Sequence, residues 1–223
     1  MVQVKVADDR TIVRLVFNIL EPFLILIYKQ ERDLTPSGGP NGYLFNLNQG
    51  FKEMPEWVRF LPSPQGISQA IVANKKGIKR LVPGLSRALG RLRFLLSVYS
   101  PSSLLQQSDE EYELIHFHSC LDLYRERKYL RSYKGKVVLT SHCPEVSHKE
   151  IIEEVFGFKA GEAPRALSDY LERVDEFAFA RADTVIFPCA DAEEPYYHTW
   201  DKFKEIRASM DVRYLLTGAP DVL

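Results

Sequence analysis

Short apolar runs recur along the chain from Phe23 onward, and most of the stretches between them are long enough to hold a helix. The runs are residues 23–28, 57–61, 112–117, 136–140, 184–187 and 212–216. Strands that alternate with helix-length segments are typical of a parallel sheet with helical crossovers. The pattern therefore predicts an α/β fold, namely a Rossmann-like three-layer domain over residues 23–223 with a mostly parallel sheet flanked by helices.

Residues 1–22 form an N-terminal extension of uncertain structure. Apolar positions alternate over residues 2–6 as in a strand, whereas positions 12, 15, 16, 19 and 20 keep helical spacing. The apolar stretch 11–27 is interrupted by Arg14, Asn18, Glu21 and Pro22, and a spanning helix needs roughly 20 predominantly apolar residues. We therefore expect neither a membrane span nor a secretory signal here.

The first run leads into a polar loop, residues 29–40, and then into a predicted helix over residues 42–53. This order places Gly38, Gly39 and Asn41 between the carboxyl end of a strand and the amino end of a helix. Backbone amides and the helix dipole favour an anion there, so we predict a donor or phosphate site. The glycine spacing fits neither a dinucleotide fingerprint nor a P-loop, and a plain turn is the alternative.

Histidine, serine and cysteine follow two later runs, where parallel strands present ligand-binding residues. The segments are His116-Phe117-His118-Ser119-Cys120 and Ser141-His142-Cys143-Pro144-Glu145. We expect three histidines at one edge of the sheet, with His116 and His118 on the same face because side chains alternate along a strand. The candidate site residues are His118, Ser119, Ser141, His142 and Glu145.

Three other interpretations of these segments stay open. A metal site could use His118, Cys120, His142 and Cys143, but their spacing matches no closed zinc pattern, and we predict no metal. A cysteine and histidine nucleophile pair lacks an identifiable third group. The histidines could also be structural, hydrogen-bonded at strand ends beside cysteines packed as small apolar groups.

Charge and cysteine content indicate the cellular compartment and the class of partner. The 223 residues carry a net charge of −1, which gives no indication of nucleic-acid binding. The three cysteines include no C-x-x-C pair. We therefore expect a reduced, cytoplasmic protein with no cofactor and no nucleic-acid partner.

The middle of the chain is basic. Residues 57–108 contain no Asp or Glu but eight Lys or Arg, and leucines at helical spacing run through the segment with a break or new start at Pro83-Gly84. A basic amphipathic helix can lie on an anionic membrane surface, and the alternative is a crossover helix with a solvated basic face. The residues predicted to face a membrane are Lys75, Lys76, Lys79, Arg80 and Arg87.

Together these segments resemble the N-terminal, acceptor-side domain of GT-B-fold glycosyltransferases, in particular the family-four type of bacterial surface polysaccharide synthesis. The resemblance covers residues 23 to 223. Its carriers are Leu24-Ile25-Leu26-Ile27-Tyr28, Ser37-Gly38-Gly39-Pro40-Asn41-Gly42, Ile115-His116-Phe117-His118-Ser119, Val138-Leu139-Thr140-Ser141-His142 and Ala180-Arg181-Ala182-Asp183-Thr184-Val185-Ile186-Phe187.

The resemblance implies transfer of a sugar from a nucleotide-sugar donor to a polysaccharide or lipid-linked acceptor. It places Gly38 and Gly39 near the donor diphosphate and His118, as the catalytic residue, against the transferred sugar. Ser141 and His142 would line the acceptor side. The basic segment would then dock an otherwise cytoplasmic enzyme on the inner face of the plasma membrane.

This sequence departs from the family at its end. Residues 214–223 look like a last strand and an interdomain linker, so the resemblance implies that the donor domain lies outside this chain, as a C-terminal domain or a partner subunit, and that the chain alone is inactive. It also predicts an exposed apolar strip near Tyr196, Tyr197, Trp200 and the C-terminus, where the second domain would pack; alternatively, these rings cap the core. Glutamates at the family's spacing, Glu145 with Glu153 and Glu154 with Glu162, are interpreted as chance.

Two other functions stay open besides the transferase. One is a non-catalytic subunit of a split transferase that binds a glycan carrier or docks on a membrane. The other is a free-standing phosphate-ester or nucleotide enzyme that uses His118 and His142.

Overall fold

The computed structural model describes residues 23–28, 39–51, 57–61, 83–102, 104–142, 145–159 and 161–215. The predictions for residues 1–22, for Gly38 and for Lys75, Lys76, Lys79 and Arg80 lie outside these described ranges.

Six parallel strands form one sheet in the order β2-β1-β3-β4-β5-β6. The strands are β1 (Ile25–Tyr28), β2 (Val58–Leu61), β3 (Leu114–Phe117), β4 (Lys136–Thr140), β5 (Thr184–Phe187) and β6 (Asp211–Tyr214). Each lies within or next to one of the six apolar runs. The predicted Rossmann-like α/β fold is therefore confirmed.

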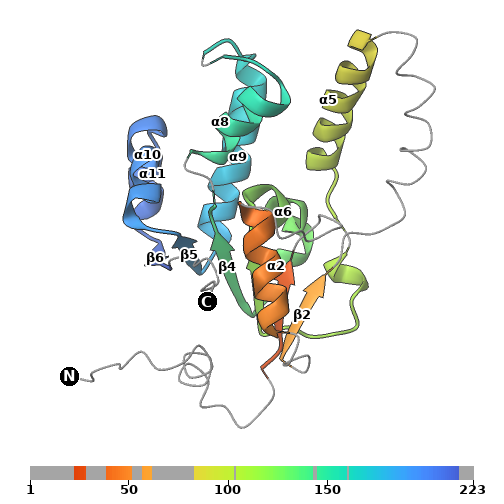
Figure 1. Ribbon diagram of the computed structural model, residues 1–223, viewed down its shortest axis with the longest axis vertical. Coiled ribbons are helices and arrows are strands. Elements are labelled where there is room, and N and C mark those ends of the chain that lie inside the picture. The colour runs from red at the N-terminus through yellow and green to blue at the C-terminus, as the bar shows by residue number, and fades with distance from the viewer. Residues whose placement is uncertain are drawn as a thin grey trace, which may run out of the picture.

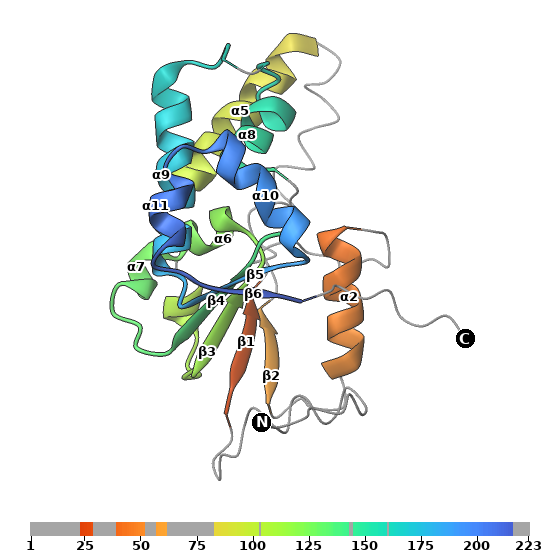
Figure 2. The ribbon, with the colours of Figure 1, turned by 90° about the vertical axis from the view of Figure 1, so that its left-hand side faces the viewer.

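Helices cover both faces of the sheet (Figure 1). They are α2 (Pro40–Phe51), α5 (Pro83–Tyr99), α6 (Cys120–Arg125), α7 (Arg127–Leu130), α8 (Ser147–Glu150), α9 (Arg165–Arg181), α10 (Ala190–Thr199) and α11 (Phe203–Arg207), with a 3₁₀ turn η1 (Leu105–Gln107) and a π-helical turn η2 (Ile151–Val155). Figure 2 shows α2 on one side of the sheet and α6, α7 and α9 on the other. The connections after β1 and β3 therefore lead to opposite faces.

The main core lies between the sheet and the α9 side. Alternate residues of β1, β3, β4 and β5, such as Ile115 and Phe117 of β3, are fully buried there, as the two-residue period of a strand requires. Phe179 of α9 gathers aromatic rings around it. These rings belong to Phe187, Tyr196, Trp200 and Phe203.

That aromatic cluster corrects one prediction. Tyr196 and Trp200 are only 1% and 3% exposed, because helices α10 and α11 turn them onto Phe179. They cap the core and do not form an exposed strip. Tyr197 and Tyr214 are more exposed, and so is Leu215 at 55%.

Helix α2 covers the other face only over β1 and β2, through a smaller cluster of Ile27, Leu44 and Val58. Gly39 precedes the helix with φ of +74°, a conformation that glycine adopts without strain, and Pro40 opens the first turn. The carboxyl ends of β3 and β4 lie on this face beside the start of α2.

Helix α5 begins at Pro83, where the sequence predicts a break or new start. Its Val98 belongs to a second apolar cluster with Ile152 and Phe156 near η2 and with Tyr170 and Val174 of α9. Figure 1 shows α5 alongside α8 and α9, away from the strands. In the part of the chain that the structure describes, no helix has both the length and the apolar character to span a membrane.

Candidate functional site

The sheet order creates a place for a ligand. β1 pairs with β2 on one side and β3 on the other, and ligands of open α/β sheets bind where connections diverge in this way, outside the carboxyl ends of the strands. A cavity of about 280 Å³ lies next to this point, outside the carboxyl ends of β3 and β4, with Pro40 of α2 in its wall. It is lined by Pro40, by residues 118–121 and 140–142, and by Ser147, Glu150, Ile151, Glu154 and Val155.

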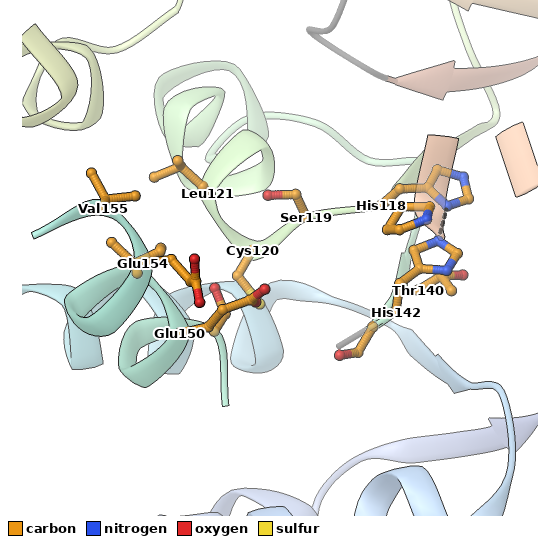
Figure 3. A pocket seen from close by; sticks show the side chains of 13 residues that line it. His118, Ser119, Cys120, Leu121, Thr140, His142, Glu150, Glu154 and Val155 are labelled. Carbon is orange, nitrogen blue, oxygen red and sulfur yellow. Dashed lines mark hydrogen bonds between the residues drawn. The ribbon is translucent and has the colours of Figure 1, made fainter. Parts of the chain in front are cut away.

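Two histidines form one end of the cavity (Figure 3). Because β3 and β4 are parallel neighbours with Phe117 opposite Leu139, the residues just after the strands come together. Nδ1 of His118 and Nε2 of His142 share a hydrogen bond of 2.9 Å, and the ring centroids are 5.2 Å apart. One hydrogen lies between the two nitrogens, so one ring donates and the other accepts.

His116 supports this pair from inside the sheet. Its ring centroid lies 4.2 Å from that of His118, and its Nε2 lies 2.7 Å from Thr140 Oγ1. Burial, together with the charge of nearby His142, lowers the pKa of His116 to about 3. His116 is therefore neutral at physiological pH and holds its neighbours through packing and a hydrogen bond.

Tyr43 of α2 packs against both histidines of the pair. Its ring centroid is 5.7 Å from that of His118 and 5.1 Å from that of His142. Its backbone N–H donates to the Gly39 carbonyl at 3.1 Å, which closes the first turn of the helix. Burial raises the pKa of the Tyr43 hydroxyl, so the ring stays neutral and fixes the amino end of α2 beside the cavity.

The two serines of the cavity are held by the fold. Ser119 is the N-cap of α6, and its Oγ accepts from the Asp122 backbone N–H at 3.4 Å. Ser141 is buried, and its Oγ lies 2.7 Å from the Tyr196 hydroxyl. Each hydroxyl therefore has a fixed direction in the cavity wall.

Glu150 of α8 and Glu154 of η2 form the opposite end of the cavity, beside Leu121 and Val155 (Figure 3). Among the described residues that line the cavity there is no Lys or Arg, so its formal charge comes from these two carboxylates. The cavity thus has a histidine end and an acidic end.

The structure brings together His118, Ser119, Ser141 and His142 of the predicted site residues. Glu145 is exposed and lies outside the group that lines the cavity. Gly39 lies next to Pro40 at the edge of the cavity, whereas the side chains of Asn41 and Arg87 lie outside the described part of the structure.

Metal ligation finds no support in the described residues. No group of three or more His, Cys, Asp or Glu side chains among them is placed to hold a metal ion. Cys120 is buried in the main core, and Cys143 lies outside the described ranges.

Sequence reasoning missed Tyr43, Glu150 and Glu154. Glu150 and Glu154 are four residues apart in the segment that follows β4, a spacing that puts two side chains on one helical face. That spacing was the available signal, but Glu153 and Glu145 look equally suitable in the sequence.

Comparisons with protein-family models, curated proteins and solved structures gave no match for this chain.

Proposed function

We propose that this chain is the acceptor-side half of a glycosyltransferase that moves a sugar from a nucleotide-sugar donor to a polysaccharide or lipid-linked acceptor. The observation that carries the proposal is the cavity outside the carboxyl ends of β3 and β4, lined by a histidine pair, fixed serine hydroxyls and two carboxylates, with no Lys or Arg among its described lining residues. Hydroxyl-rich sugars suit such a wall because they both donate and accept hydrogen bonds.

In this proposal the residues at the two ends of the cavity have different roles. His118 contacts the transferred sugar, and its hydrogen bond to His142 orients the ring. The amino end of α2, which begins beside the cavity, faces the donor diphosphate, because free backbone N–H groups and the helix dipole favour negative charge. The donor's nucleotide is held by a second domain or a partner subunit.

A replacement in the cells from which the gene comes tests the proposal. We expect His118→Ala to abolish one surface or lipid-linked glycan and to accumulate its shorter precursor, as seen by mass spectrometry of extracted glycans. His198→Ala is the matched control, since this exposed histidine of α10 lies away from the cavity. An unchanged glycan profile in His118→Ala cells with normal protein levels would overturn the proposal.

A second candidate is a non-catalytic subunit that docks on an anionic membrane, and α5 favours it. Its Leu89, Leu92, Leu96 and Tyr99 are exposed and share one side of the helix at heptad-like spacing. Residues 57–108 carry eight basic residues and no acid, which complements anionic lipid. Such a helix lies in the membrane interface with its apolar face inserted.

Vesicle sedimentation tests this candidate. We expect the chain to bind phosphatidylglycerol vesicles, and Leu96→Ser to weaken binding about tenfold through loss of a buried leucine. Leu215→Ser is the control, because Leu215 is 55% exposed against 56% for Leu96 but lies after β6. Equal binding by the two variants would exclude α5 as the membrane contact.

A further inference from the structure

Two carboxylates, those of Glu150 and Glu154, form the acidic end of the cavity. Glu150 ends α8, and Glu154 lies one turn later in η2. Both are exposed, and no described Lys, Arg or His side chain forms an ion pair with either carboxylate. Two acceptors that pair with no cation in the described part of the chain therefore line the cavity together.

The backbone under these carboxylates is unusual. In η2 the Phe156 N–H donates to the Ile151 carbonyl at 3.3 Å, a π-type bond over five residues. Single π turns inside helices are rare and occur frequently at functional sites. On the other side, Ile152 and Phe156 anchor the turn in the apolar cluster with α9, so the direction of the two glutamates is set by packing.

The neighbours of the carboxylates are apolar. Leu121, Ile151 and Val155 lie beside Glu150 and Glu154 in the cavity wall. A wall that combines carboxylate oxygens with apolar surface fits a sugar ring, which carries hydroxyls at its rim and C–H groups on its faces. An ionised carboxylate only accepts hydrogen bonds, and its two oxygens can take two neighbouring hydroxyls at once.

We infer that Glu150 and Glu154 bind neighbouring hydroxyls of the acceptor sugar, and that Leu121 and Val155 contact its C–H face. The inference rests on the proposed transferase function and adds to it the orientation of the two substrates in the cavity. A phosphorylated group is repelled from this end by the two carboxylates, so the diphosphate lies at the α2 end and the uncharged acceptor sugar at the glutamate end.

Saturation-transfer NMR of the whole chain with the methyl glycosides of glucose, galactose and mannose tests the inference. We expect at least one glycoside to bind, and the double variant Glu150→Gln and Glu154→Gln to weaken its binding about tenfold, because hydrogen bonds to charged acceptors are the stronger ones. Glu153→Gln is the matched control, since Glu153 sits in η2 but lines a separate hollow with His148 and Glu172.

The outcomes separate the two claims. If a glycoside binds the double variant as tightly as the unchanged chain, the glutamates do not recognise the sugar and the inference fails, while the transferase proposal stands. If no glycoside binds the unchanged, folded chain, no sugar site exists in the cavity and the transferase proposal fails with it. Tighter binding of inorganic pyrophosphate than of any glycoside at the glutamate end also overturns the inference.

Discussion

Two hydrogen-bonded histidine pairs lie in this domain, and their partners differ. His148 Nδ1 lies 2.9 Å from Asp175 Oδ2, and the same oxygen accepts the His148 backbone N–H at 2.8 Å. His118 meets another imidazole, that of His142, also at 2.9 Å. The first pair joins α8 to α9 inside the protein, whereas the second lines the cavity.

The His148–Asp175 pair holds a helix in place, whereas the His118–His142 pair lines the cavity. The carboxylate of Asp175 fixes the first turn of α8, and the Trp200 ring packs edge-on against His148 at 5.6 Å. Helix α8 then carries Glu150 to the cavity wall. The imidazole pair joins two residues that line the cavity, and it faces the space where a ligand fits. One pair therefore supports an element of the cavity wall, and the other forms part of the cavity lining.

The largest expected effect comes from Asp175→Ala. It removes the acceptor of two buried donors on His148, and breaking such a buried interaction costs about 3 kcal/mol of the free energy of unfolding. Urea denaturation measures this loss. The control is Asp169→Ala on the same helix, whose exposed pair with Arg165 contributes under about 0.5 kcal/mol. Equal losses of unfolding free energy in the two variants would show that the buried pair contributes no more to stability than the exposed one.

Low pH should destabilise the folded chain through His116, which packs beside the histidine pair of the cavity. The pKa of this ring is about 3 in the folded chain against 6.5 when unfolded, so below pH 6.5 the unfolded chain takes up a proton that the folded chain does not. Stability is therefore full above pH 6.5 and falls as the pH drops towards 3, by about 2 kcal/mol at pH 5.

The variant His116→Gln isolates this contribution. It keeps a hydrogen-bonding group opposite Thr140 but removes the titration. We expect the fall in the free energy of unfolding between pH 7 and pH 5 to shrink by about 2 kcal/mol relative to the unchanged chain. Urea denaturation at the two pH values measures it, and an identical fall in both proteins would show that His116 is not the acid-sensitive group.

The smallest effect on stability is expected for His142→Ala. His142 is partly exposed, and the loss of its hydrogen bond to His118 costs about 1 kcal/mol. The same change should weaken methyl glycoside binding in saturation-transfer NMR, because the cavity loses the ring that orients His118. A loss of stability as large as that of Asp175→Ala, with binding intact, would place this pair with the structural one.

Much of this fold follows from the spacing of apolar residues along the sequence and from the alternation of side chains along each strand. Strands β4 and β5 occupy their predicted residues because apolar side chains recur there over the length of a single strand. The same alternation predicted that His116 and His118 share a face, and their ring contact confirms it. Helix α2 begins two residues earlier than predicted, since Pro40 is suited to a first helical position.

The site could be predicted only in part. Parallel strands gather whatever follows them at one edge, so His118 and His142 were predictable. The glutamates were not, because the packing of Ile152 and Phe156 decides which of several acidic side chains faces the cavity. Tyr196 and Trp200 were wrongly predicted as exposed, since the ring of Phe179 that covers them lies on another helix.

The most direct test of the account follows the imidazole signals of the histidines by NMR while a methyl glycoside is added to the whole chain. We expect the signals of His118 and His142 to shift with glycoside concentration, whereas those of His148, paired with Asp175, and His198, exposed on α10, stay in place. Shifts at neither His118 nor His142 over a concentration range that saturates glycoside binding would contradict it.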